Sequence, residues 1–137
     1  MKHVLSAMLV VGLTVAMMTG CRGGGQIYEV KDNPVQTATG KPASTEDVQK
    51  AIIGAGAKLG WIMAVSKPGE ILGTLNVRSH TAVVTIPFTS HSYSILYKDS
   101  TNLKYNADKH TIHENYTGWI QRLDNEIRAR LTTVGMN

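Results

Sequence analysis

The residues most able to do chemistry are histidines, and two of them stand in a short segment rich in metal-ligand types. Residues 108–114 read DKHTIHE, which places His110 and His113 three residues apart with an acid at each end. A zinc site needs three or four ligands that converge on one point. The segment is predicted to run from a loop into a helix, and no helix face gathers both histidines with a general base. We therefore expect solvated or helix-capping histidines, and no metal ion or other cofactor.

Serine–histidine pairs are the second candidate, because a serine beside a histidine can act as an activated nucleophile. Two pairs occur, Ser79–His80 and Ser90–His91, and both fall where the sequence predicts tight turns. Neither pair is accompanied by a glycine elbow or an oxyanion loop, and Ser and His are common polar turn residues. We interpret them as turn residues and assign no catalytic residue. A small hydrolase or a metal-binding protein built on the histidines is the alternative hypothesis.

Cys21 is the only cysteine, and its position bears on where the protein is located. A basic start, Met1–His3, precedes an apolar run from Val4 to Met18, as in a secretory signal. The run is shorter than the about 20 apolar residues that a membrane-spanning helix needs. A lone cysteine cannot form a disulfide within the chain, so an exported domain must rely on its core. Cys21 is either a free thiol after ordinary signal cleavage or a lipid attachment site.

The residues around Cys21 favour lipid attachment. The sequence MTGC at residues 18–21 resembles the processing box of bacterial lipoproteins, which usually has Leu where this chain has Met18. The resemblance implies a cleaved signal peptide over residues 1–20 and at least two acyl chains at Cys21, enough for stable membrane anchoring. Arg22 follows the cysteine, where an Asp would imply retention in the inner membrane. The implied location is therefore the outer membrane, facing the periplasm.

After the signal, the sequence predicts a flexible tether over residues 21–43 and one domain over residues 44–137. Gly, Pro, Thr and Asn dominate the tether segment, and nothing in it recurs at helical spacing. Only Ile27–Val30 is β-prone, and it could add an edge strand. The chain has 14 Lys and Arg against 10 Asp and Glu, a net charge of +4. It has no basic cluster interleaved with aromatic residues, which argues against nucleic-acid binding.

Hydrophobic periodicity predicts the order helix, four strands, helix. The first helix begins at Ser44 with an acidic first turn and ends near Gly60, as capping preferences predict. Four runs with a period of two residues follow, over residues 61–65, 70–79, 82–88 and 93–97. Their short connections allow only antiparallel neighbours. The last helix covers residues 113–131, and Asp124 and Arg128 are expected to form an ion pair on its exposed side.

Both helices are amphipathic, which sets the fold class. Their apolar stripes are Val48, Ile52, Ala55 and Leu59 in the first helix, and Tyr116, Ile120, Leu123, Ile127 and Leu131 in the last. Each stripe must be buried against another element. The prediction is an α+β domain of two layers, a four-stranded antiparallel meander with both helices on one sheet face.

The sheet face away from the helices is the most suggestive surface. It is predicted to mix aliphatic and hydrogen-bonding side chains, with Ile62, Ala64 and Val83 among them. It is either an ordinary solvated face or a docking platform. The residues of the candidate docking face, here called the open-face set, are Leu72, Thr74, Asn76, Arg78, Thr85, Ser94, Leu96 and Lys98. The occupant would be another envelope protein, a second copy of this chain, or a cell-wall glycan; strand pairing at a sheet edge is a further route.

Several stretches resemble a family of small, largely uncharacterised proteobacterial lipoproteins, namely AIIGAGAKLGW, GTLNVRSHTAVVTIPF, YSILYKDSTNLKY and IHENYTGWIQRLDNEI. The resemblance covers the signal and nearly all of the chain after it. It implies an envelope location and a single domain, and it carries no known activity and no site residues. The sequence therefore predicts a membrane-anchored, non-catalytic interaction or accessory domain. The alternative is a small envelope hydrolase or metal-binding protein that uses a histidine cluster.

Overall fold

The computed structural model describes residues 24–136, so Cys21 and the expected signal peptide lie outside the described residues. Its elements are β1 (Gly25–Gln26), β2 (Val30–Pro34), α1 (Thr45–Lys58), β3 (Trp61–Lys67), β4 (Glu70–Val77), β5 (His80–Pro87), β6 (Ser92–Thr101), β7 (Thr111–Ile112) and α2 (Asn115–Thr132). Five strands form one antiparallel sheet in the order β2-β6-β5-β4-β3, and β1 pairs with β7 separately. No helix in the described part of the chain is long and apolar enough to cross a membrane.

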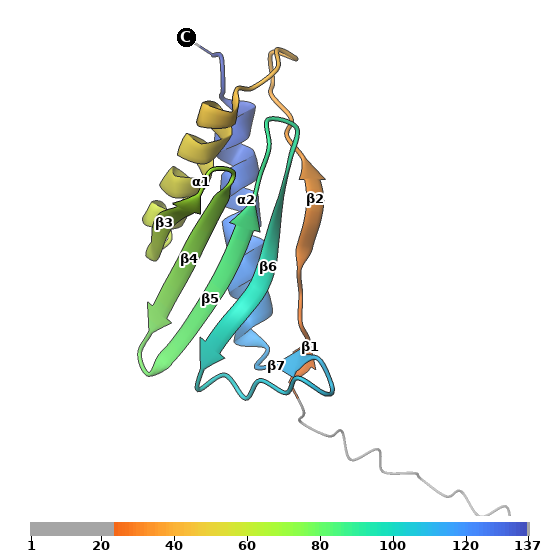
Figure 1. The fold of residues 1–137 in the computed structure, drawn as a ribbon, viewed down its shortest axis with the longest axis vertical. Coiled ribbons are helices and arrows are strands. Elements are labelled where there is room, and N and C mark those ends of the chain that lie inside the picture. Colours follow the sequence, from red (N-terminus) through yellow and green to blue (C-terminus); the bar gives the residue numbers. More distant parts are fainter. Residues whose placement is uncertain (1–23, 137) are drawn as a thin grey trace, which may run out of the picture.

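The α+β class is confirmed, with α1 before the meander β3 to β6 and α2 after it (Figure 1). The helices pack against each other, and α1 also contacts β3. The predicted stripes of both helices are buried apart from Leu59, which is partly buried. They share one core with the inward-facing strand residues Trp61, Ile71, Leu75, Val84, Ile86, Tyr93 and Ile95. Burying large apolar side chains of this kind stabilises a fold by about 1.5–3 kcal/mol each.

The expectation of four strands is wrong in one respect, because β2 adds a fifth strand at the edge beside β6. Val30 pairs with Ile95 and Asn33 with Tyr93, with a register shift between the two pairs. Val30 is buried in the core. The strand lies inside the segment that composition assigned to the tether. The β-prone stretch Ile27–Val30 had left an edge strand open, but only its last residue, Val30, belongs to β2. The rest of the strand was not expected because its partner lies about 60 residues further along the chain.

Close contact between α1 and the sheet depends on a glycine in the helix. A Cβ atom added at Gly56 would lie 2.5 Å from Cγ of Met63, and one added at Gly73 would lie 3.0 Å from its sulfur. The Met63 side chain therefore fills space left free by a glycine of α1 and a glycine of β4. This packing lets the helix approach β3 closely, as tight interiors require.

The start of α1 carries a capping box. The Asp47 backbone N–H donates to Ser44 Oγ at 3.0 Å, and the Ser44 backbone N–H donates to Asp47 Oδ2 at 2.9 Å. Ser44 Oγ also lies 2.8 Å from Asp47 Oδ2. The Ser44 backbone N–H, followed by its hydroxyl, lowers the pKa of the Asp47 carboxyl below its ordinary value.

Ser44→Ala is expected to lower the free energy of unfolding by about 1 kcal/mol at neutral pH. Because the pKa of Asp47 is lowered in the folded state, its contribution is present above the unfolded pKa, near 4, and is lost as pH falls through the folded value. Losing the hydroxyl removes part of that lowering, so the variant should lose less stability than the parent between pH 7 and pH 3. Urea unfolding at both pH values measures this. Ser44→Thr keeps a hydroxyl and should behave as the parent does; an equal loss in both variants would contradict the capping role.

Candidate functional site

The open face of the sheet carries side chains in two rows that cross four strands. Cross-strand pairing sets the first row as Ala64, Leu72, Thr85 and Leu96, and the second as Ile62, Thr74, Val83 and Asp99. Directly paired residues on neighbouring strands lie on the same face and contact each other. Ile62 is 64% exposed, while Leu72 and Leu96 are half-buried by their neighbours. The two rows therefore form an aliphatic and threonine-rich surface with one acidic group at its β6 end.

Most of the open-face set lies where the sequence placed it. Leu72, Thr74, Thr85 and Leu96 belong to the two rows. Asn76 is exposed further along β4, and its side-chain oxygen accepts a hydrogen bond from the Thr81 hydroxyl at 2.9 Å. Lys98 is exposed at the register shift in β6, between the pairs that its neighbours make with β5.

Two members of the set do not lie on this open surface. β4 ends at Val77, and Arg78 is in the following turn with a positive φ of 55°. Ser94 is only 8% exposed, because β2 covers it and the Asp32 backbone N–H donates to its hydroxyl at 2.9 Å. β4 ends two residues earlier than expected, which leaves Arg78 outside the sheet. The additional strand β2 pairs with β6 and covers Ser94.

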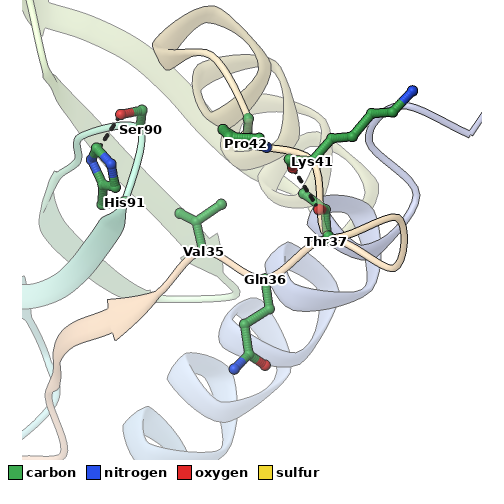
Figure 2. Close-up of a pocket in the computed structure, with 9 residues that line it drawn as sticks. Val35, Gln36, Thr37, Lys41, Pro42, Ser90 and His91 are labelled. Carbon is green, nitrogen blue, oxygen red and sulfur yellow. Dashed lines mark hydrogen bonds between the residues drawn. The ribbon is translucent and has the colours of Figure 1, made fainter.

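A shallow depression of about 550 Å³ lies where the β5–β6 turn meets the segment before α1 (Figure 2). Its lining includes the Ser90–His91 pair, in which Ser90 Oγ is 2.9 Å from His91 Nδ1. The Val35 N–H donates to the His91 carbonyl at 2.8 Å and holds the turn against the segment. In Figure 2 the Lys41 side chain points away from the pair.

The Ser90–His91 pair has the geometry of a polar turn. An activated serine needs a histidine that a third group orients, and the residues that line this depression include no Asp or Glu. The Thr89 hydroxyl instead accepts the backbone N–H groups of His91 and Ser92, each at 3.1 Å. These contacts stabilise the turn and assemble no catalytic set.

The histidine pair that the structure brings together is His80 with His113, whose ring centroids are 6.3 Å apart. His80 Nδ1 lies 2.7 Å from the Asn102 carbonyl, which can only accept, so Nδ1 carries a hydrogen and, in the neutral ring, Nε2 has the lone pair. His113 Nδ1 accepts the Asn115 backbone N–H at 3.2 Å, so its neutral ring has the hydrogen on Nε2. Of the two remaining nitrogens, Nε2 of His80 is therefore an acceptor and Nε2 of His113 is a donor. A metal ion would need a lone pair from each of them. Across residues 24–136, no three His, Cys, Asp or Glu side chains form a group that could hold a metal ion.

The most buried polar cluster joins β2, β6 and α2. Asp124 is 6% exposed, and its Oδ1 accepts hydrogen bonds from the Tyr93 hydroxyl at 2.5 Å and from Asn33 Nδ2 at 2.9 Å. Its other oxygen is 3.3 Å from Arg128. Burial, and then the hydrogen bond to Asp124, raises the pKa of Tyr93, so this hydroxyl stays protonated and donates. The expected ion pair is confirmed, but Asp124 lies inside the domain and not on the exposed side.

Sequence reasoning missed this cluster although one signal for it was present. Asp124 comes four residues after Ile120 and three before Ile127, which places it on the buried stripe of α2. Its partner Asn33 lies in the segment expected to be a tether, far away in the sequence, so local spacing does not connect the two residues. The hydrogen bonds of the cluster connect the edge strand β2 to β6 and to α2.

The chain matches no protein-family model, no curated protein and no solved structure.

Proposed function

We propose that this protein is a membrane-anchored envelope lipoprotein whose domain binds another protein without catalysis. The observation that carries the proposal is the open face, where two rows of aliphatic and threonine side chains cross four strands. Figure 1 shows the helices packed on the other side of this sheet. Ile62 is the most exposed large aliphatic side chain of the two rows, and apolar side chains gathered on an uncovered sheet face are typical of an interaction site.

The chemistry of the face favours a protein partner over a glycan. The two rows contain Ile, Leu, Val, Ala and Thr, with Asp99 as their single charged residue, and no aromatic ring on which a sugar could stack. The central part of a protein interface is depleted in charge in the same way. The proposed partner is an envelope protein with a complementary apolar surface, reached from an anchor at Cys21.

A photo-crosslinking amino acid at Asn76 tests this docking face in cells, with Gln121 on α2 as the matched exposed control. We expect a discrete adduct from position 76 and none from position 121, with mass spectrometry naming the partner. Adding Ile62→Lys, which puts a charge in the second row, should abolish that adduct. Adducts at twice the mass of the chain would identify a second copy, and an absence of adducts at position 76 would overturn the docking proposal.

A further inference from the structure

The folded domain begins at Gly24, far earlier than composition suggested. Gly25 pairs with Ile112 and Gln26 with Thr111. The Ile27 N–H donates to the His110 carbonyl at 3.0 Å. A Cβ atom at Gly24 would lie 2.6 Å from the Ile112 carbonyl carbon, so only glycine allows the chain to pass this close. The first four described residues are therefore held against the segment that precedes α2.

This attachment sets how far the domain can be from Cys21. Three residue steps separate Cys21 from Gly24, and a fully extended chain spans at most about 3.6 Å per step, or about 11 Å. The 18 residues of α2 alone span about 27 Å. A lipid on Cys21 is thus close to one end of the domain and far from the other.

We infer that the end of the domain formed by Gln26, Arg78, Lys104, Tyr105 and Lys109, here called the anchor end, lies against the lipid headgroups of the membrane. The inference rests on the proposed lipid anchor and adds an orientation to it. Figure 1 shows β1, β7 and the β4–β5 turn at the same end of the domain, which is the end where the described chain begins. The Ser90–His91 turn and the segment before α1 lie at the opposite end and face away from the membrane.

The chemistry of the anchor end suits a headgroup layer. Arg78, Lys104 and Lys109 are exposed at this end, together with the exposed carboxylates of Asp108 and, just after β7, Glu114, so the basic groups outnumber the acidic ones by three to two. Lys and Arg can lay their alkyl stems on apolar surface while the charge stays among phosphates. Tyr105 is 41% exposed, and tyrosine is enriched at the membrane–water boundary.

The anchor end is also rigid, so the orientation extends to the whole domain. Asn102 links the two loops, because its Nδ2 donates to Ser79 Oγ at 3.0 Å and its carbonyl accepts from His80 at 2.7 Å. The Tyr105 ring stacks on Tyr97 of β6, with centroids 4.5 Å apart. A surface fixed in this way to the main sheet cannot turn independently of it.

Lipid crosslinking with the full-length protein in its own membrane tests the inference. A photo-crosslinker at Asp108, next to Lys109 of the anchor end, should yield phospholipid adducts by mass spectrometry, and one at exposed Gln36, at the opposite end, should not. Inserting 20 Gly and Ser residues between Gly23 and Gly24 should abolish the lipid adduct at position 108 while the protein stays in the membrane fraction. Such a linker has a mean span of about 25 Å, enough to lift the domain off the headgroups.

The mass of the Cys21 peptide separates the two proposals. If this peptide carries acyl chains and position 108 yields no lipid adduct, or no more than position 36, the orientation is overturned and the anchor stands. If the peptide is unmodified, the anchor itself is overturned, and the orientation with it. Adducts at position 108 that persist after the linker insertion would also contradict the inference, because the short connection would then have no effect.

Discussion

Asp124→Ala should lower the free energy of unfolding by about 2–4 kcal/mol. The substitution removes the acceptor of the Tyr93 hydroxyl and one of the two acceptors of the Asn33 amide. The amide keeps the Tyr93 oxygen, 2.8 Å away, but the Tyr93 hydroxyl is left without its acceptor in a site where Asp124 itself is almost fully buried. A hydrogen bond to a charged group contributes about 1.5–3 kcal/mol, and a buried polar group without a partner costs about 1–3 kcal/mol. Chemical unfolding followed by Trp fluorescence measures the loss.

Three companion variants show whether the buried cluster is responsible. Asp124→Asn keeps one acceptor oxygen and should lose about half as much. Tyr93→Phe removes one donor, and its effect combined with Asp124→Ala should be smaller than the sum of the two, because both break the same hydrogen bond. Gln121→Ala changes an exposed position on the same helix and should stay within about 0.5 kcal/mol of the parent. A loss for Asp124→Ala no greater than that of Gln121→Ala would contradict the role given to the cluster.

Gly56→Val should cost about 2–3 kcal/mol, although valine forms helices slightly better than glycine. The new Cβ would lie 2.5 Å from Cγ and 2.9 Å from the sulfur of Met63, so the methionine or α1 must shift, and overpacking of this kind costs about 1–3 kcal/mol. The same substitution at Gly118 of α2 is the matched control, because a Cβ there meets nothing within 4 Å. Gly118→Val should change the free energy of unfolding by less than about 0.5 kcal/mol.

The double variant Gly56→Val with Met63→Ala tests the cause. Truncating Met63 removes the atoms that the new side chain would meet, so the double variant should be more stable than the sum of the single effects by at least about 1 kcal/mol. Strictly additive losses, measured by urea unfolding, would show that the cost at Gly56 arises elsewhere.

Local patterns were enough to predict most of the regular structure. The alternation in β3 to β6 and the four-and-three spacing in α2 are strong signals over many residues, and capping at Ser44 marked the start of α1. β1 and β7 were not predicted, and β2 was touched only at Val30, the last residue of a stretch that could add an edge strand, because the evidence for these strands is non-local. β1 and β7 have two residues each, and β2 combines a register shift with Asn and Pro. These strands form because they pair with distant strands and pack on the core. The spacing of apolar residues within one segment does not predict such pairing.

The candidate site also has one part that local patterns predict and another that depends on distant partners. Leu72, Thr74, Thr85 and Leu96 share a face because side chains alternate along a strand with a period of two, and that much was predictable. The register shift in β6 interrupts this period at Lys98. Ser94 obeys the same period but is covered by β2, which the sequence did not place in the sheet. For the histidines, closeness in sequence was misleading. His110 and His113 are three residues apart, but the ring that lies beside His113 is that of His80. The β4–β5 turn brings His80 to this position.

The pairing of β1 with β7 has a mechanical consequence. A pulling force that enters the domain at Gly24 meets the two residue pairs of β1 and β7 first, and β2, with its longer contact along β6 and its link to Asp124, is loaded only after they open. Opening would free residues 24–29, an extension of about 20 Å, while the sheet and its open face stay intact. The short pair therefore opens before the rest of the domain, so that a force applied at Gly24 leaves the folded core intact.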